Sequence, residues 1–118
     1  MTELFLNENL LEEIPPEIGQ LSKLINLVLD SNRIQSLPPE LIRCTELRML
    51  HLRENSVSVL PEGFSKLQNL KVLDIAENNM QYLPIELKEI ELRAIWLSEN
   101  QNQPLVKYTG GLKLTLEN

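Results

Sequence analysis

The sequence predicts an α/β solenoid, in which short parallel strands of successive turns line a concave face while irregular or short helical segments cover the convex face. Three observations predict this class. Asparagine recurs at Asn9, Asn32, Asn55, Asn78 and Asn100, at spacings of 23, 23, 23 and 22 residues. Each asparagine ends a Leu-x-Leu-x-x-Asn frame or a conservative variant of it. Leucine supplies 25 of the 118 residues, whereas Phe, Trp and Tyr together make up 4%, so one aliphatic side chain builds the core repeatedly.

The second and third repeats match position by position. The second has Leu24, Leu27, Leu29, Asn32, Ile34 and Leu37 where the third has Leu47, Leu50, Leu52, Asn55, Val57 and Leu60, and a proline follows each. This frame is that of the leucine-rich repeat, which implies a horseshoe with a parallel concave sheet. We expect five repeats, over 1–23, 24–46, 47–69, 70–91 and 92–106, and then a C-terminal segment over 107–118.

The strands and the turns that follow them account for the first half of each repeat. Apolar residues alternate with other residues before the asparagine, and this period of two predicts a short strand that pairs in parallel with its neighbours. The asparagine column should turn the chain inward and bond to backbone groups of adjacent turns, because a buried amide needs partners. Removing one such amide should cost about 1 to 3 kcal/mol.

The second half of each repeat is predicted to cross the convex side. Proline pairs at 15–16 and 38–39 favour an extended or turn start, and a short helical segment such as 40–43 follows. A second apolar column closes this side, at Ile18, Leu41, Phe64 and Leu87. Cys44 shares its repeat position with Leu21 and Leu67, so we expect it to pack in the core rather than to react.

The two ends of the array depart from this frame. Met1 already stands at the opening position of the first repeat, so Leu4, Leu6 and Leu11 are expected to show apolar edges that offer a surface for self-association. That start indicates a fragment or an alternative product of a longer array. The C-terminal segment contains Gly110-Gly111 and then alternating leucines at 112, 114 and 116, a pattern consistent with a capping strand whose partner edge the sequence does not identify.

Charge and motif content argue against several classes of function. Eleven basic and 17 acidic side chains give a net charge of −6, which disfavours nucleic acid as a partner. The sequence has no Cys/His/carboxylate cluster with metal-ligand spacing, no glycine-rich phosphate loop and no nucleophile motif, so we expect no enzyme, no metal and no cofactor. No apolar run approaches a membrane span, and a single cysteine without a glycosylation acceptor favours the cytoplasm.

Function is therefore expected on the concave surface. The register places these candidate partner-binding residues there: Phe5, Val28, Asp30, Met49, His51, Arg53, Asp74, Glu77, Trp96 and Glu99. Phe5, Val28 and Trp96 form an outward apolar column that is typical of interface anchors. Glu8, Glu54, Glu77 and Glu99 form an acidic ridge beside it. The alternative is that Trp96 packs under the C-terminal segment and that the glutamates serve solubility.

The closing repeat carries a more specific pattern. Its run Trp96-Leu97-Ser98-Glu99-Asn100-Gln101, followed by Pro104-Leu105, resembles the last repeat of the LAP family of polarity scaffolds, which combine leucine-rich repeats with PDZ domains. The resemblance implies an intracellular scaffold at the cytoplasmic face of the basolateral membrane, cell junctions or synapses. Its implied role is apical-basal polarity and receptor clustering through protein binding, with membrane association only through partners.

Two alternatives stay open at this point. Leucine-proline repeats of the same period also resemble scaffolds of Ras and MAP kinase signalling, for which the partner would be a small GTPase or a phosphatase complex. The other alternative is a truncated array with no independent function, which would associate through its first repeat.

Overall fold

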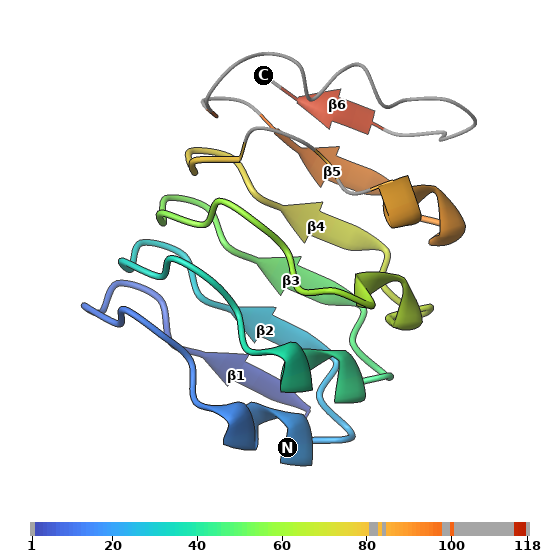
Figure 1. Cartoon of the computed structure of the whole chain (residues 1–118), viewed down its shortest axis with the longest axis horizontal. Helices are drawn as coiled ribbons and strands as arrows, with labels where there is room; N and C mark the ends of the chain where they lie inside the picture. Colours follow the sequence, from blue (N-terminus) through green and yellow to red (C-terminus); the bar gives the residue numbers. More distant parts are fainter. Residues whose placement is uncertain (1, 81–82, 84, 98–99, 101–114, 118) are drawn as a thin grey trace.

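The computed structural model describes residues 2–80, 83, 85–97, 100 and 115–117 of the chain. Its strands are β1 (Glu3–Phe5), β2 (Asn26–Val28), β3 (Met49–His51), β4 (Val72–Asp74), β5 (Ala94–Trp96) and β6 (Thr115–Glu117). They form one sheet in chain order, and every neighbouring pair is parallel. Figure 1 shows the strands stacked one per turn, with a short helical segment on each return path between neighbouring strands from β1 to β5. The predicted parallel solenoid is confirmed.

The middle residue of each strand builds the core. Leu4 pairs with Leu27, Leu27 with Leu50, Leu50 with Leu73, and Leu73 with Ile95. The side chains of Leu27, Leu50, Leu73 and Ile95 are completely buried. Since successive strand residues face opposite sides, the first and last residues of each strand are directed to the concave surface. The leucine register therefore decides which side chains lie on the concave surface.

A residue in the left-handed conformation lies in the turn that follows each of the strands β1 to β4. Ser31, Glu54 and Glu77 have φ values of 60°, 60° and 56°, and Glu8 has a φ of 58°. This conformation is unfavourable for a residue with a Cβ atom and persists only where the surroundings hold it. An asparagine follows each of these residues, and its side chain supplies that support.

The asparagine side chains join consecutive turns. The Oδ1 atom of Asn78 accepts a bond from the Val57 N–H at 2.9 Å, and its Nδ2 group donates to the carbonyls of Leu52 at 2.8 Å and Ile75 at 3.1 Å. Asn32, Asn55 and Asn100 make the equivalent bonds, each to the preceding turn and to a carbonyl of its own turn. The predicted bonding of these amides to adjacent turns is present at these four positions.

Asn9 differs from the other four. It is exposed, and its amide donates to the carbonyls of Leu6 and Asn7 in its own turn. The difference has a simple cause, because no turn on the other side of Asn9 lies within the described residues. Asn9 therefore supports a local turn and does not link two turns as predicted.

Short 3₁₀ helices cover the convex side. They are η1 (Pro16–Gln20), η2 (Pro39–Arg43), η3 (Phe64–Lys66) and η4 (Ile85–Glu89), and each buries the one apolar residue predicted for that column. Gly19 allows η1 and η2 to approach closely, since a Cβ atom there would lie 2.7 Å from the Glu40 carbonyl oxygen. The convex side is thus built from single helical turns, for which i to i+3 bonding is the usual form.

Cys44 lies in the convex core as predicted. Its side chain is completely buried, and its thiol donates to the Ile18 carbonyl at 3.2 Å. Burial also raises the pKa of the thiol, which disfavours the reactive thiolate.

The two ends of the described sheet carry different contacts. At the first strand, Leu4, Leu6 and Leu11 are half-buried against the core, while Phe5 is 58% exposed and Leu10 is 71% exposed. At the other end, β6 pairs in parallel with β5, from Ala94 with Thr115 to Trp96 with Glu117. Of the three leucines expected in a capping strand, Leu116 falls in β6, while Leu112 and Leu114 lie outside the described residues. No helix within the described ranges is long and apolar enough to span a bilayer.

Candidate functional site

The concave face consists of rows that run across the strands, with one residue from each turn. The leading row holds the first residue of each strand, namely Glu3, Asn26, Met49, Val72 and Ala94. The trailing row holds the last residue of each strand, namely Phe5, Val28, His51, Asp74 and Trp96. Neighbouring strands lie about 4.8 Å apart, so adjacent side chains of a row are close together on the concave surface.

The predicted site residues of the trailing row differ in how far solvent reaches them. Phe5 is exposed, while Val28, His51 and Trp96 are half-buried. Asp74 is only 8% exposed, although it belongs to the same row. Phe5 and Val28 are direct neighbours across β1 and β2, which puts two apolar side chains side by side on the concave face.

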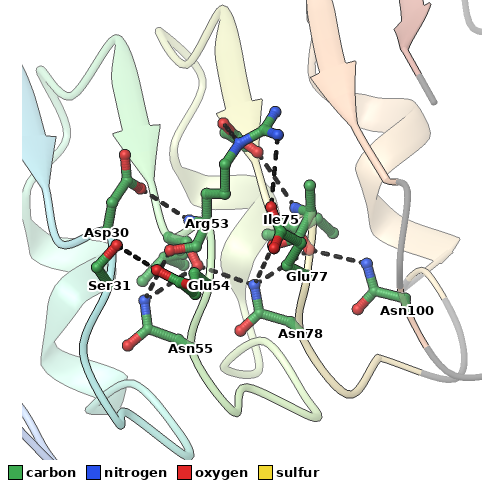
Figure 2. Close-up of polar contacts among 12 residues, drawn as sticks. Asp30, Ser31, Arg53, Glu54, Asn55, Ile75, Glu77, Asn78 and Asn100 are labelled. Atoms are coloured by element: carbon green, nitrogen blue, oxygen red, sulfur yellow. Dashed lines mark hydrogen bonds and ion pairs between the residues drawn. The ribbon is translucent and has the colours of Figure 1, made fainter.

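Arg53 explains why Asp74 is covered. Its Nε atom donates to Asp74 Oδ2 at 2.8 Å, and its Nη1 atom lies 3.8 Å from Glu77 Oε2 (Figure 2). The backbone N–H of Arg53 also donates to Asp30 Oδ1 at 2.8 Å. The remaining oxygen of Asp74 accepts from the N–H of Ala76 at 3.2 Å. Four predicted site residues, Asp30, Arg53, Asp74 and Glu77, thus form one polar cluster across three turns.

Two residues of the cluster have raised pKa values, for different reasons. The hydrogen bond to Asp74 raises the pKa of Arg53, so the guanidinium stays charged. Burial raises the pKa of Asp30, and the bond from the Arg53 N–H opposes that effect only in part. Asp30 is therefore a carboxylate whose charge is poorly compensated in the folded chain.

The predicted acidic ridge occupies the left-handed positions of the turns. Glu8, Glu54 and Glu77 are exposed there, and Glu54 accepts a hydrogen bond from the Ser31 hydroxyl (Figure 2). Glu99, the fourth predicted member, lies outside the described residues. The ridge places negative charge along the edge of the sheet where the strands end.

Sequence reasoning missed a second charged row at the opposite edge of the sheet. Arg48, Lys71 and Arg93 directly precede the leading row and are joined by backbone bonds from Lys71 N–H to Arg48 and from Arg93 N–H to Lys71. A hollow of about 470 Å³ adjoins them, lined by Arg48, Met49, Asn69, Lys71, Val72 and Arg93. The signal was available, because the residue after the first core leucine is basic in three successive repeats.

The concave face offers contacts for binding. Its centre mixes apolar side chains such as Phe5, Val28 and Trp96 with polar ones such as His51 and Asp74, while one edge is acidic and the other is basic. His51 stands between Val28 and Asp74 in the register. In the part of the chain that the structure describes, no group of three or more His, Cys, Asp or Glu side chains is placed to hold a metal ion.

The chain matches one protein family over nearly its whole length. The family is described as "Leucine rich repeat", and its model matches residues 1–57 and residues 45–101. Strands β1 to β5 and the five asparagines of the repeat frame fall within these matched ranges, whereas β6 lies beyond them. No curated protein sequence matches the chain significantly.

Two solved structures show the same fold. The leucine-rich repeat ectodomain of the receptor kinase SOBIR1 from Arabidopsis thaliana has a TM-score of 0.78 and 28% identity, covering 98% of this chain and 68% of the other. The leucine-rich repeat protein LIC12759 of Leptospira interrogans has a TM-score of 0.60 and 24% identity, covering 100% of this chain and 43% of the other. The second likeness shows the fold alone.

Proposed function

Because the chain belongs to the leucine-rich repeat family, we propose that it is a non-catalytic protein-interaction module whose concave face receives a protein partner. Repeat proteins of this kind typically bind other proteins, and their stacked turns create extended concave surfaces. The observation that carries the proposal is the pair Phe5 and Val28. These two apolar side chains lie side by side on a regular sheet, where solvent reaches both of them.

The rigidity of the face supports this role. Asparagine side chains hold each turn to the next, and the Arg53 cluster holds side chains from three turns in place. A surface that is already ordered loses little conformational entropy when a partner binds. The apolar pair Phe5 and Val28 can then give affinity, while the charged edges give orientation.

We further propose that the module belongs to an intracellular scaffold of the apical-basal polarity type. The support is the resemblance of the closing repeat to the LAP family, of which Trp96 and Asn100 are described residues. Trp96 is half-buried on β5, and Asn100 bonds to Met80 of the previous turn. Under this proposal the protein works in the cytoplasm, at junctions, synapses or the basolateral membrane, and reaches the membrane through its partners.

Two double variants, which each replace two apolar residues by arginine, test whether partners bind at the concave face. F5R/V28R places two cations on the trailing row, whereas V59R/I85R makes the same change at Val59 and Ile85, which lie outside the sheet and are 59% and 63% exposed. Each variant and the unmodified chain would capture proteins from polarised epithelial cells, after circular dichroism shows equal folding.

We expect F5R/V28R to lose the captured proteins that V59R/I85R retains. Identical sets of proteins from both variants would refute the concave assignment. The identity of the retained proteins tests the finer proposal: junction and polarity proteins support it, while a small GTPase or phosphatase complex places the chain in signalling instead.

A further inference from the structure

The basic row at the leading edge of the sheet has a geometry of its own. Backbone bonds of 2.8 Å join Ile25 to Arg48, Arg48 to Lys71, and Lys71 to Arg93, so these positions continue the sheet beyond its strands. Arg48 and Arg93 are exposed and Lys71 is half-buried. Two strand spacings separate Arg48 from Arg93, which is a span of about 10 Å.

Within residues 2–80, 83, 85–97 and 100, these three cations form no ion pair. The only cation that forms ion pairs within those ranges is Arg53. Lys71 Nζ instead donates a hydrogen bond to the Glu91 carbonyl oxygen at 3.3 Å. Glu46 and Glu91 lie on the same turns, two residues before Arg48 and Arg93, without forming an ion pair with them. In a chain of net charge −6, three aligned cations without carboxylate partners indicate a surface for a negatively charged group.

The alignment favours an extended anion over a compact one. A single phosphate or carboxylate group is best bound by donors that converge on one point. Here the donors are spread along a line of about 10 Å, which an extended peptide crosses in about three residues. Alternate side chains of such a peptide point to opposite sides, so carboxylates can meet the cations while the residues between them face away.

The hollow beside the basic row adds apolar contacts to its positive charge. Met49 and Val72 of the leading row line it together with the three cations and Asn69. Asn69 is held in place, because its amide donates to the Thr45 carbonyl at 2.8 Å. An extended segment along the hollow can therefore place acidic side chains over the basic row and small apolar side chains over Met49 and Val72.

We propose that this basic hollow binds an extended acidic segment of the protein partner, with carboxylates at alternate positions and small apolar residues between them. The proposal rests on the proposed function, since it names the chemistry of that partner. A nucleic acid is less favoured, because three cations neutralise few phosphates and the −6 charge of the chain repels a long polyanion.

Fluorescence anisotropy with a labelled peptide tests the proposal. The probe is Glu-Val-Glu-Val-Glu between two glycines, and the control peptide replaces each Glu with Gln. The variant R48E/K71E removes two cations of the row. The matched variant K23E/K88E makes the same change of charge at two exposed lysines that do not line the hollow.

The expected result is that the unmodified chain binds the glutamate peptide and not the glutamine peptide. R48E/K71E should weaken that binding at least about tenfold, while K23E/K88E changes it by less than about twofold. Three results would overturn the proposal: no binding of the probe, an equal loss in both variants, or equally tight binding of an oligodeoxynucleotide of similar length.

The result separates this proposal from the proposed function. F5R/V28R changes the trailing row and leaves every residue of the hollow intact. If the probe fails to bind while F5R/V28R still loses captured proteins, the concave module stands and only the acidic segment is wrong. If neither test shows an effect, both proposals fail.

Discussion

Asn78 joins its own turn to the previous one through Val57, whose backbone N–H donates to Asn78 Oδ1 at 2.9 Å. The same side chain donates to the Leu52 carbonyl of that previous turn at 2.8 Å. One amide therefore satisfies a donor and an acceptor that are buried on the far side of a turn interface. It also explains how a polar side chain that is only 5% exposed is tolerated beside a leucine core.

Replacing Asn78 with alanine should destabilise the chain by about 1 to 3 kcal/mol, because the Val57 N–H and three carbonyls each lose a hydrogen bond at a buried position. The matched variant Asn9→Ala should cost less than about 1 kcal/mol, since Asn9 is exposed and bonds only within its own turn. Chemical denaturation followed by circular dichroism measures both changes. Equal losses would contradict a role in linking turns.

The pair of Arg53 and Asp74 should show a coupling energy of about 0.5 to 3 kcal/mol in a double-mutant cycle. Arg53→Met leaves the nearly buried Asp74 without its cation, so this single change should be the most damaging. Adding Asp74→Asn should recover part of that loss. The free energy of unfolding of the four proteins gives the coupling, and simple additivity would show that the ion pair contributes nothing specific.

Because the pKa of Asp30 is raised, we expect the free energy of unfolding of the chain to fall as the pH rises. Burial raises its pKa above the ordinary value of 3.8, so just above that pH the folded chain holds a proton that the unfolded chain has released. Raising the pH through this window therefore destabilises the folded state. Asp74 adds to the effect, while Arg53 and His51 oppose it.

The variant Asp30→Asn should remove this pH dependence while its side-chain oxygen still accepts from the Arg53 N–H. We expect it to be more stable than the unmodified chain at about pH 7, with a gain that shrinks towards about pH 3. Thermal unfolding at both values measures the difference. A gain that grows on acidification would show that ionised Asp30 stabilises the fold.

Cys44 should react with a thiol reagent at least about a hundredfold more slowly in the folded chain than in denaturant, because exposure of a buried group requires local or global opening. Its complete burial and its raised pKa act in the same direction. The time course of labelling by iodoacetamide gives the two rates. Rapid labelling under native conditions would mean that the convex side opens at Cys44.

The sequence predicts the core of this fold well and its charged surface less well. Leucine positions repeat with one period, so Leu27, Leu50 and Leu73, which are completely buried, could be aligned from the sequence alone. The strand register does not determine the rotamer of a long side chain such as Arg53. The contact by which Arg53 covers the Asp74 carboxylate on the next strand could therefore not be predicted from the sequence.

The turns were hidden for a different reason. A left-handed residue is normally signalled by glycine, but here Glu54 and Glu77 take that conformation because the following asparagine holds the turn. The basic row was visible in principle at Arg48, Lys71 and Arg93. The prediction of concave-face residues did not include it, because that prediction started at the first residue of each strand, one position after the basic residue.

The bonds of the asparagine column between turns also bear on how fast the chain folds. Each of them joins residues 20 to 26 positions apart, whichever turn is considered. Closing a loop of that length costs a nearly constant entropy, so every added turn meets the same kinetic barrier. Folding should therefore start at one pair of turns and spread in both directions like a zipper, with contact distances along the chain that do not grow with the number of repeats.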